Sequence, residues 1–250
     1  MLKNLISAAA VLALASGASA TVIYSTSFEA PTFAVGNLNG QNGWIADTGT
    51  VANTAGGAHT GTQFARMTGA NIGGVGTSAW QWQGTSSLTA AQLAVAPIVR
   101  ASVWVSMSGT PGTRSFSAGL DCYDTAVSRI GQILINLDGS VSIIDGLGTQ
   151  SSSAAGLINP LNYHKLTIEM NYATGTQKFF VDGIDSGVTG LFANTDFGDA
   201  DFRGIRGTGT GGAAFELRAD DYILENEAIP APASLALMGM GLIAGGRRRR

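Results

Sequence analysis

Residues 133–144 read Ile-Leu-Ile-Asn-Leu-Asp-Gly-Ser-Val-Ser-Ile-Ile, and this stretch decides the fold class. Two apolar runs flank an Asp-Gly pair, which is a strong signal for a β-hairpin. A two-residue loop would set Ile135 opposite the polar Ser142. A three-residue loop instead sets β-branched residues against each other, Ile135 opposite Val141 and Ile133 opposite Ile143. We expect the three-residue loop because it buries these four residues together and puts Gly139 at a left-handed position.

The same alternation of apolar and polar residues dominates the chain on both sides of this hairpin. Over 99–107 the odd-numbered residues are Val, Ala, Val, Val and Met, and the even-numbered ones are mostly polar. Residues 116–123 alternate in the same way. One apolar and one mostly polar face is the pattern of an antiparallel sheet with one side in water. We therefore predict an all-β fold, an antiparallel β-sandwich of the jelly-roll type over residues 21–228, with one short helical turn at 88–96.

A second hairpin is predicted over residues 166–181, with its turn at 173–176. We expect Ile168 opposite Val181 and Met170 opposite Phe179, followed by a tight turn at Asp182-Gly183. The tryptophans at 80 and 82 alternate with glutamines, so both rings point to one side of their strand. We expect Trp80 and Trp82 in the core together with Trp44.

Charge and cysteine content exclude some classes of protein. Of the 14 basic residues, Lys3 and the four C-terminal arginines lie in terminal segments, so nine basic residues stand against 17 acidic ones elsewhere. This acidic balance argues against nucleic-acid binding, which needs basic surface to replace counterions. The chain has one cysteine, Cys122, so an intrachain disulfide cannot form. Stability must come from a packed core or from a bound ion.

Both ends of the chain are predicted to be address signals. Lys3, the apolar run 5–14 and the cleavage pattern Ala18-Ser19-Ala20 indicate a secretory signal peptide over residues 1–20, removed by signal peptidase. At the other end, Pro230 and Pro232 stand at the start of a mostly apolar stretch of 16 residues, 231–246. As a helix they would reach about 24 Å, short of a hydrocarbon core of about 30 Å. We predict a short C-terminal transmembrane helix, its cytoplasmic end held by a basic cluster of Arg247, Arg248, Arg249 and Arg250.

This tail over residues 229–250 closely resembles the PEP-CTERM sorting signal of exported bacterial proteins. That pattern consists of Pro-Glu-Pro, a short hydrophobic helix and a terminal arginine cluster, and here Ala231 stands in place of the glutamate. The resemblance implies that an exosortase-like enzyme recognises the region of Pro230 and Pro232 and processes the tail. The protein would then be exported, and either anchored in the cell envelope through the membrane or released after processing. An ordinary C-terminal membrane anchor is the alternative.

The middle of the chain resembles the concanavalin A-like, laminin-G-like jelly roll. The matching stretches are Ser27-Phe28-Glu29, Gly43-Trp44, the hairpin 165–183 and the closing strand 215–224. Members of this group are mainly carbohydrate- or protein-binding modules, and some are glycosidases. The resemblance implies a structural Ca²⁺ ion between an early glutamate and an aspartate of the last strand, here Glu29 with Asp220 or Asp221. A rival acidic cluster is formed by Asp196, Asp199 and Asp201; alternatively, these acids are solvated turn residues.

Polar faces of three strands suggest a ligand-binding surface. Trp104 shares its polar face with Arg100, Tyr123 shares one with Asp121, and Gln132 shares a third with Asn136. If these strands are neighbours, aromatic rings would flank amides and a carboxylate, an arrangement that suits sugars. The alternative is that a loop covers Trp104 and Tyr123.

Sequence motifs for catalysis are absent, so we predict that the protein is not an enzyme. Retaining glycosidases need two carboxylates about 5 Å apart, and the chain has no Glu-x-Asp-x-x-Glu run or similar. His59 and His164 do not form a paired zinc motif, and Gly207–Gly212 leads into a strand-like segment rather than a helix. The leading hypothesis is an exported, non-catalytic surface or matrix protein that binds polysaccharide. The alternatives are an adhesive protein that contacts other proteins and an unrecognised glycosidase.

Overall fold

The hairpin that decides the fold class is present in the computed structural model, which describes residues 20–46, 52–72, 78–84, 86–109, 116–207 and 215–229. Strands β9 (Arg129–Asn136) and β10 (Val141–Ile144) pair antiparallel, with Ile135 opposite Val141 and Ile133 opposite Ile143. The three-residue loop is therefore confirmed, and Gly139 has the expected positive φ of 77°. All four β-branched side chains are buried.

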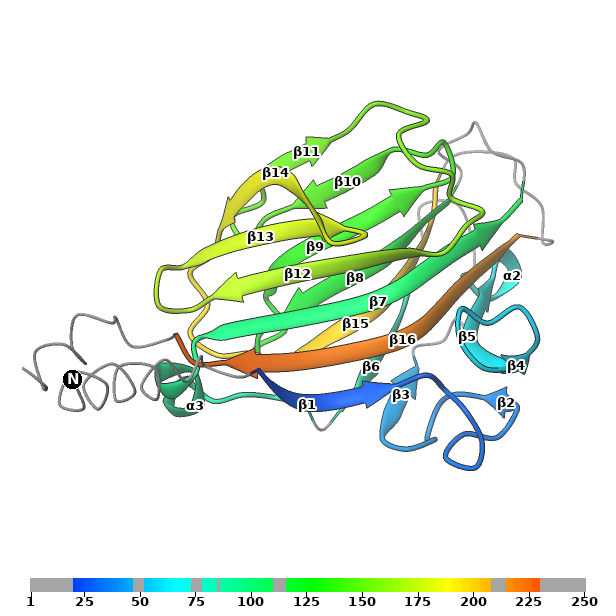
Figure 1. Ribbon diagram of the computed structural model, residues 1–250, viewed down its shortest axis with the longest axis horizontal. Helices are drawn as coiled ribbons and strands as arrows, with labels where there is room; N and C mark the ends of the chain where they lie inside the picture. The colour runs from blue at the N-terminus through cyan, green and yellow to red at the C-terminus, as the bar shows by residue number, and fades with distance from the viewer. Residues whose placement is uncertain are drawn as a thin grey trace, which may run out of the picture.

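The described strands form two antiparallel sheets that pack face to face, so the predicted β-sandwich is confirmed (Figure 1). The nine-stranded sheet has the order β14-β13-β12-β7-β16-β5-β4-β2, and β1 pairs with β16. Its strands are β1 (Thr21–Thr26), β2 (Gly36–Asn37), β4 (Ala52–Ala55), β5 (Gln63–Thr68), β7 (Ile98–Ser108), β12 (His164–Asn171), β13 (Thr176–Val181), β14 (Ile184–Leu191) and β16 (Glu216–Glu227). The seven-stranded sheet has the order β11-β10-β9-β8-β15-β6-β3. Its remaining strands are β3 (Trp44–Ala46), β6 (Ser78–Gln83), β8 (Phe116–Tyr123), β11 (Gln150–Ser152) and β15 (Asp199–Arg206).

The core lies between the two sheets and follows the predicted apolar faces. The odd-numbered residues of β7 from Val99 to Met107 are buried, and so are the even-numbered residues of β8 from Phe116 to Cys122. At the β3 end, Trp44 is buried against Phe28 and Tyr222, with ring centroids 5.2 and 5.4 Å apart. The prediction that Trp44 belongs to the core is confirmed.

The prediction that Trp80 and Trp82 lie in the core is wrong. On β6 the inward-facing residues are Ala79, Gln81 and Gln83, and the two tryptophans lie half-buried on the outer face. Contacts of one glutamine and one tryptophan explain why the glutamines face inward and the tryptophans outward. The amide of Gln83 donates to the carbonyl of Asn42 (2.9 Å). The guanidinium of Arg203 lies 4.9 Å from the ring centroid of Trp80, which is cation–π geometry.

The second hairpin is present, but its predicted register is wrong by two residues. Ile168 lies opposite Phe179, and Leu166 lies opposite Val181. The turn occupies residues 172–175 rather than 173–176, because Gly175 takes a positive φ of 65° and its N–H closes the turn on the carbonyl of Asn171. The tight turn at Asp182-Gly183 is confirmed between β13 and β14.

Two short helices, α2 (Gly69–Ile72) and α3 (Ala90–Val95), interrupt the strands. The second is the predicted helical turn, and it begins with a capping box between Thr89 and Gln92. Within the described ranges, no helix is long and apolar enough to cross a membrane.

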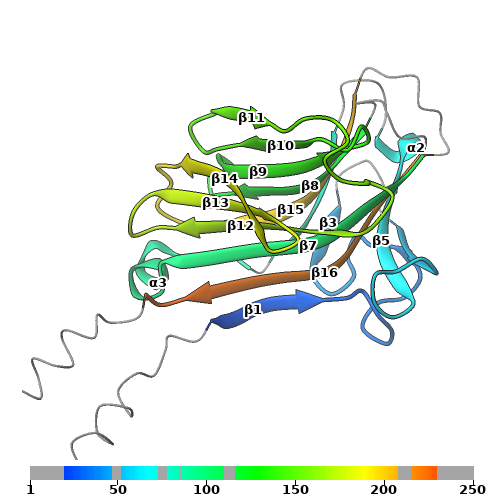
Figure 2. The ribbon, with the colours of Figure 1, turned by 45° about the horizontal axis from the view of Figure 1, so that its top comes forward.

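The start of the first strand and the end of the last strand lie next to each other. Thr21 at the start of β1 pairs with Asn226 near the end of β16, and both views show these strand ends side by side (Figures 1 and 2). Ala20 is the first described residue. Several predictions fall outside the described residues: the cleavage residue Ala18, the predicted C-terminal transmembrane helix, and the predicted sorting residues Pro230, Pro232, Arg247, Arg248, Arg249 and Arg250.

Candidate functional site

The six predicted ligand-binding residues divide between the two sheets. Arg100 and Trp104 lie on β7 of the nine-stranded sheet, whereas the other four lie on β8 and β9 of the seven-stranded sheet: Asp121, Tyr123, Gln132 and Asn136. The expectation that all six share one surface is therefore wrong. Strands β7 and β8 turn their apolar faces toward the same core, so their polar faces point in opposite directions.

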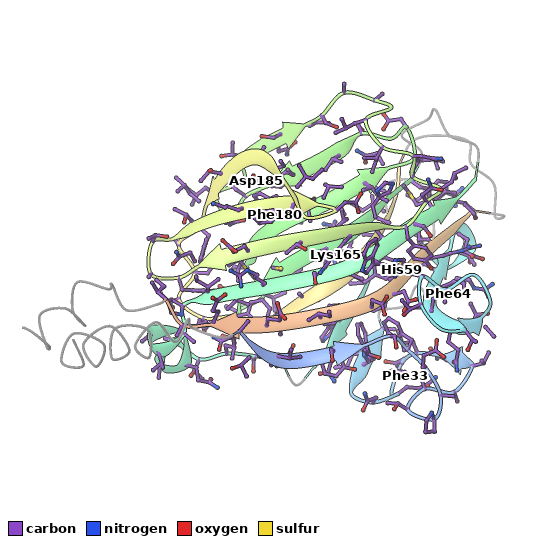
Figure 3. All side chains as sticks on the ribbon, in the orientation of Figure 1. Phe33, His59, Phe64, Lys165, Phe180 and Asp185 are labelled. Carbon is purple, nitrogen blue, oxygen red and sulfur yellow. The ribbon has the colours of Figure 1, made fainter. Side chains whose placement is uncertain are left out.

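Trp104 is covered on one side by a loop residue. The ring of His59 stacks on it with centroids 3.8 Å apart and planes 16° apart. Nδ1 of His59 lies 2.7 Å from Oδ2 of Asp221, which fixes the imidazole in this position. Figure 3 labels His59 over the nine-stranded sheet, above the strand β16 that carries Asp221. For Trp104, the structure therefore agrees with the alternative that a loop covers the ring.

Arg100 links three neighbouring strands. Its Nε donates to Oε2 of Glu169 on β12 (2.7 Å), and its Nη1 donates to Glu227 on β16. Burial lowers the pKa of the guanidinium, but the two carboxylates outweigh this effect and raise it. These contacts occupy the side chain in cross-strand ion pairs.

The outer face of the seven-stranded sheet carries a polar network centred on Asp121. Its carboxylate is fully buried and accepts hydrogen bonds from Gln132 Nε2 (2.8 Å) and the hydroxyl of Tyr123 (3.0 Å). Nε of Arg129 lies 2.9 Å from Oδ1, and Nη1 of Arg203 donates to Oδ2. One buried negative charge is thus held between two guanidinium groups, which is the condition under which a buried ion is tolerated.

Asn136 belongs to the same face but to a separate network. Its carbonyl accepts from Ser117 Oγ (2.5 Å), and its amide donates to Ser140 and Ser142 (2.9 and 2.8 Å). These bonds connect β8, β9 and β10 across the face. Four of the six predicted residues therefore do share one surface.

Sequence reasoning missed the part of this face that β15 and β6 contribute. Strand β15 places Asp201 opposite Asp121 of β8. On its other side it places Arg203 opposite Trp80 of β6, and Phe202 opposite Gln81. The next position of this antiparallel pairing brings Trp82 beside Asp201. The available signal is the alternation Asp-Ala-Asp-Phe-Arg over 199–203, which indicates a polar strand face, whereas in the sequence these acids are interpreted as a rival calcium cluster or as solvated turn residues. The third member of that cluster, Asp196, lies before the strand and binds the N–H and hydroxyl of Thr125 (3.1 and 2.7 Å).

Burial shifts the protonation of this face. Desolvation raises the pKa of Asp199 to about 6, although a hydrogen bond from Asp201 acts in the opposite direction. Desolvation, followed by the charges of Asp199 and Asp121, raises the pKa of Asp201 well above its usual value. Burial and the charge of Asp121 raise the pKa of Tyr123 to about 12. The raised pKa values favour the protonated forms of Asp199 and Asp201, and Tyr123 keeps its hydroxyl hydrogen at neutral pH.

Several buried polar atoms of this face have no hydrogen-bond partner among the described residues. They include Nε1 of Trp80, Nε of Arg203 and Oδ1 of Asp201, and also Oδ1 of Asp121 and Nε of Arg129, which are close enough for an ion pair. Each unpaired buried group of this kind costs roughly 1–3 kcal/mol. Groups with hydroxyls placed here could relieve that cost.

The predicted calcium residues hold one loop in place. The carboxylate of Glu29 accepts from the N–H groups of Thr62 and Gln63 (both 2.7 Å) and from the Thr62 hydroxyl (3.0 Å). Burial raises the pKa of Glu29, but these hydrogen bonds outweigh it, so the pKa is lowered.

Asp220 and Asp221 bind the other end of the same loop. Oδ2 of Asp220 accepts from the N–H groups of His59 and Thr60 (2.9 and 3.0 Å), and Asp221 binds the hydroxyl of Thr60 (2.7 Å). Among the described residues, no three His, Cys, Asp or Glu side chains are grouped as metal ligands. The lone pairs of these acids are largely taken by hydrogen-bond donors, which is a poor fit for a cation. Calcium binding stays a prediction.

The fold is a jelly-roll β-sandwich, and the C-terminal one of the two predicted address segments has a match among known families. Residues 228–250 match the PEP-CTERM protein-sorting motif, which marks an exported protein associated with the membrane or envelope. No curated protein matches the chain.

Among solved structures, a carbohydrate esterase of the Shiga toxin-encoding bacteriophage phi24B is similar over 84% of this chain and 100% of its own, with 14% identity and a TM-score of 0.56. A structure of botulinum neurotoxin type C, titled for its interaction with two ganglioside molecules, is similar over 86% of this chain and 49% of its own, with 10% identity and a TM-score of 0.51. The binding domain of botulinum neurotoxin DC is similar over 85% and 49%, with 9% identity and a TM-score of 0.51. The chain spans about half the length of these neurotoxin structures, and the similarities establish the fold alone.

Proposed function

We propose that this protein is an exported, non-catalytic surface or matrix component that binds polysaccharide on the outer face of its seven-stranded sheet. The observation that carries the proposal is the border of aromatic rings around the Asp121 network. Trp80 and Trp82 stand on β6 at one side of the network and Tyr123 on β8 within it, and all three are half-buried. Sugar rings pack their C–H faces on such side chains while their hydroxyls bond to polar groups nearby.

The polar groups of this face are held in fixed positions, which favours recognition. Asp121 fixes the planes of Arg129 and Arg203, and both guanidinium groups retain further N–H donors. Asp199 and Asp201 supply two acidic side chains at the β15 side. Side chains fixed before the ligand arrives lose little entropy when it binds.

The arrangement of the acids supports binding rather than hydrolysis. The carboxyls of Asp199 and Asp201 lie on one face of the same strand and interact with each other, whereas the two carboxyls of a glycosidase flank the glycosidic bond. Asp121 is enclosed by two arginines and two neutral donors, which leaves it without access to a glycosidic bond.

Affinity electrophoresis tests this face directly. The full chain would be run in native gels containing mixed-linkage β-glucan, xylan or alginate. We expect retardation in at least one gel, and we expect Trp82→Ala to weaken the interaction at least tenfold. Trp104→Ala is the matched control, because that ring lies on the other sheet and stacks on His59. Equal losses in both variants, or retention unaffected by Trp82→Ala, would reject this surface.

The proposal also includes processing of the tail by an exosortase-like enzyme near Pro230 and Pro232. Mass spectrometry of the mature protein from its native envelope would identify its C-terminus. A new terminus between residues 228 and 234 supports processing. A mature protein that retains Arg250 would show that the tail acts as an ordinary anchor.

A further inference from the structure

A cleft of about 510 Å³ opens between the edges of the two sheets, and none of its lining residues belongs to the Asp121 network. Its walls are β13 and β14 of the nine-stranded sheet and β10 and β11 of the seven-stranded sheet. Both ribbon views place these edges next to each other (Figures 1 and 2). Figure 3 labels Asp185 at this edge, on the opposite side of the sandwich from Phe33. The volume lies within the range of about 300–1,000 Å³ that is usual for small-molecule sites.

The floor of the cleft is aliphatic. It consists of side chains that continue the core toward the sheet edges: Val141, Ile143, Ile158, Val181 and Val188. At the mouth, Leu157 is 63% exposed and Ile184 is 73% exposed, although both line the cleft. An apolar ligand that covers these side chains would remove their apolar surface from water, which favours binding.

The rim is polar and carries negative charge. Four serines line it from two chain segments: Ser151, Ser152 and Ser153 in one, and Ser186 in the other. Asp182 and Asp185 add two carboxylates, and the lining residues in the described part of the chain include no basic side chain and no aromatic ring. Nδ1 of His164 lies 2.7 Å from Oδ2 of Asp182, whereas Oδ1 of Asp185 accepts a hydrogen bond from the N–H of Gly187 (2.8 Å).

We infer that this cleft binds a small amphiphile with a single alkyl chain and an uncharged, hydroxyl-bearing head group. The aliphatic floor takes the alkyl chain. The serine hydroxyls can donate hydrogen bonds to the hydroxyls of the head and accept them, and the carboxylates accept them. An anionic head is disfavoured because it would approach Asp185 without a compensating cation. A free sugar is disfavoured because the lining offers no ring on which it could stack.

The test uses dodecyl maltoside below its micellar concentration, titrated into the full chain by calorimetry. Maltose and dodecyl sulfate serve as comparison ligands. We expect dodecyl maltoside to bind, maltose alone to give no heat, and dodecyl sulfate to bind at least fivefold more weakly. Asp185→Asn should reduce the difference between the two dodecyl compounds. Binding of maltose, or dodecyl sulfate binding that equals dodecyl maltoside binding, would overturn the assignment of the ligand class.

Two substitutions close the cleft from opposite walls. Ser186→Trp on β14 and Ser152→Trp on β11 each place a large ring at the mouth, and each should weaken dodecyl maltoside binding at least tenfold. Ser87→Trp is the matched control, because Ser87 is exposed and does not line the cleft. All variants retain residues 231–246, so detergent binding to that apolar segment is the same in each. Unchanged affinity in both cleft variants, with far-UV circular dichroism intact, would reject the site.

Discussion

Replacing Asp121 with asparagine tests whether the buried charge network stabilises the fold. The substitution keeps the shape of the side chain but removes its charge. Arg129 and Arg203 would then lie partly buried beside a neutral group, with side chains 32% and 12% exposed. In the native protein, Gln132 Nε2 and the Tyr123 hydroxyl both donate hydrogen bonds to a carboxylate oxygen of Asp121. In the variant, the NH2 group of the asparagine side chain would replace one carboxylate oxygen, so a donor would face a donor.

The expected loss of unfolding free energy is large. Breaking a buried ion pair by removing one partner typically costs about 3–5 kcal/mol. For a domain of this size, each kcal/mol lowers Tm by about 2–4 °C, so Tm should fall by about 6–20 °C. A loss in this range would be a large part of the 5–15 kcal/mol that usually stabilises a domain.

Urea denaturation of the full chain, followed by tryptophan fluorescence and far-UV circular dichroism, measures the loss. Asp185→Asn is the control, because this aspartate is exposed and its replacement should change stability by about 0.5 kcal/mol or less. A triple variant, Asp121→Leu with Arg129→Met and Arg203→Met, should recover much of the stability because it removes all three charges together. A change below about 1 kcal/mol in Asp121→Asn with an unchanged m-value would refute the reasoning.

Three further outcomes are expected. The raised pKa of Asp199, about 6, means that its contribution to stability is complete below the unfolded value near 4 and is lost as the pH rises through 6. Asp199→Asn should therefore leave stability nearly unchanged at pH 4 and stabilise the protein by about 1–2 kcal/mol at pH 8, after allowance for solvent screening. The same difference in urea midpoint between variant and wild type at both pH values would contradict this. Gly119→Ala should destabilise by about 3 kcal/mol or more, because the new Cβ would lie 2.0 Å from the carbonyl oxygen of Ile133; a wild-type melting curve would disprove that contact. If calcium binds Glu29 and Asp220 or Asp221, Tm should be higher in Ca²⁺ than in EDTA, and equal values would exclude the site.

The local features of the fold were predictable because they depend on near neighbours in the chain. The period of two assigned the buried faces of β7 and β8, and the Asp-Gly pair with its β-branched neighbours determined the register of β9 and β10. The second hairpin was misplaced because its register depends on which residue takes the left-handed conformation, and Gly175 was one position away from the expected place in the turn.

Long-range features were not predictable in the same way. Alternation shows that Trp80 and Trp82 share a side, but not which side faces the core; that choice depends on Arg203, which is more than 120 residues away. Likewise, Asp201 meets Asp121 only through the pairing of β15 with β8. The period of two in β7 and β8 also cannot reveal that the chain changes sheets between them. The candidate site was therefore half predicted: its β8 and β9 residues were found, and its β6 and β15 residues were not.

The position of β16 determines how the sandwich would respond to a mechanical load. If the protein is tethered through the segment that follows Glu227, a pulling force enters along the axis of a 12-residue strand. That strand is paired with β7 on one side and with β1 and β5 on the other. Force parallel to the strand would have to shear hydrogen bonds on both sides together rather than peel them one at a time. A surface protein attached in this way would resist drag better than one attached through an edge strand.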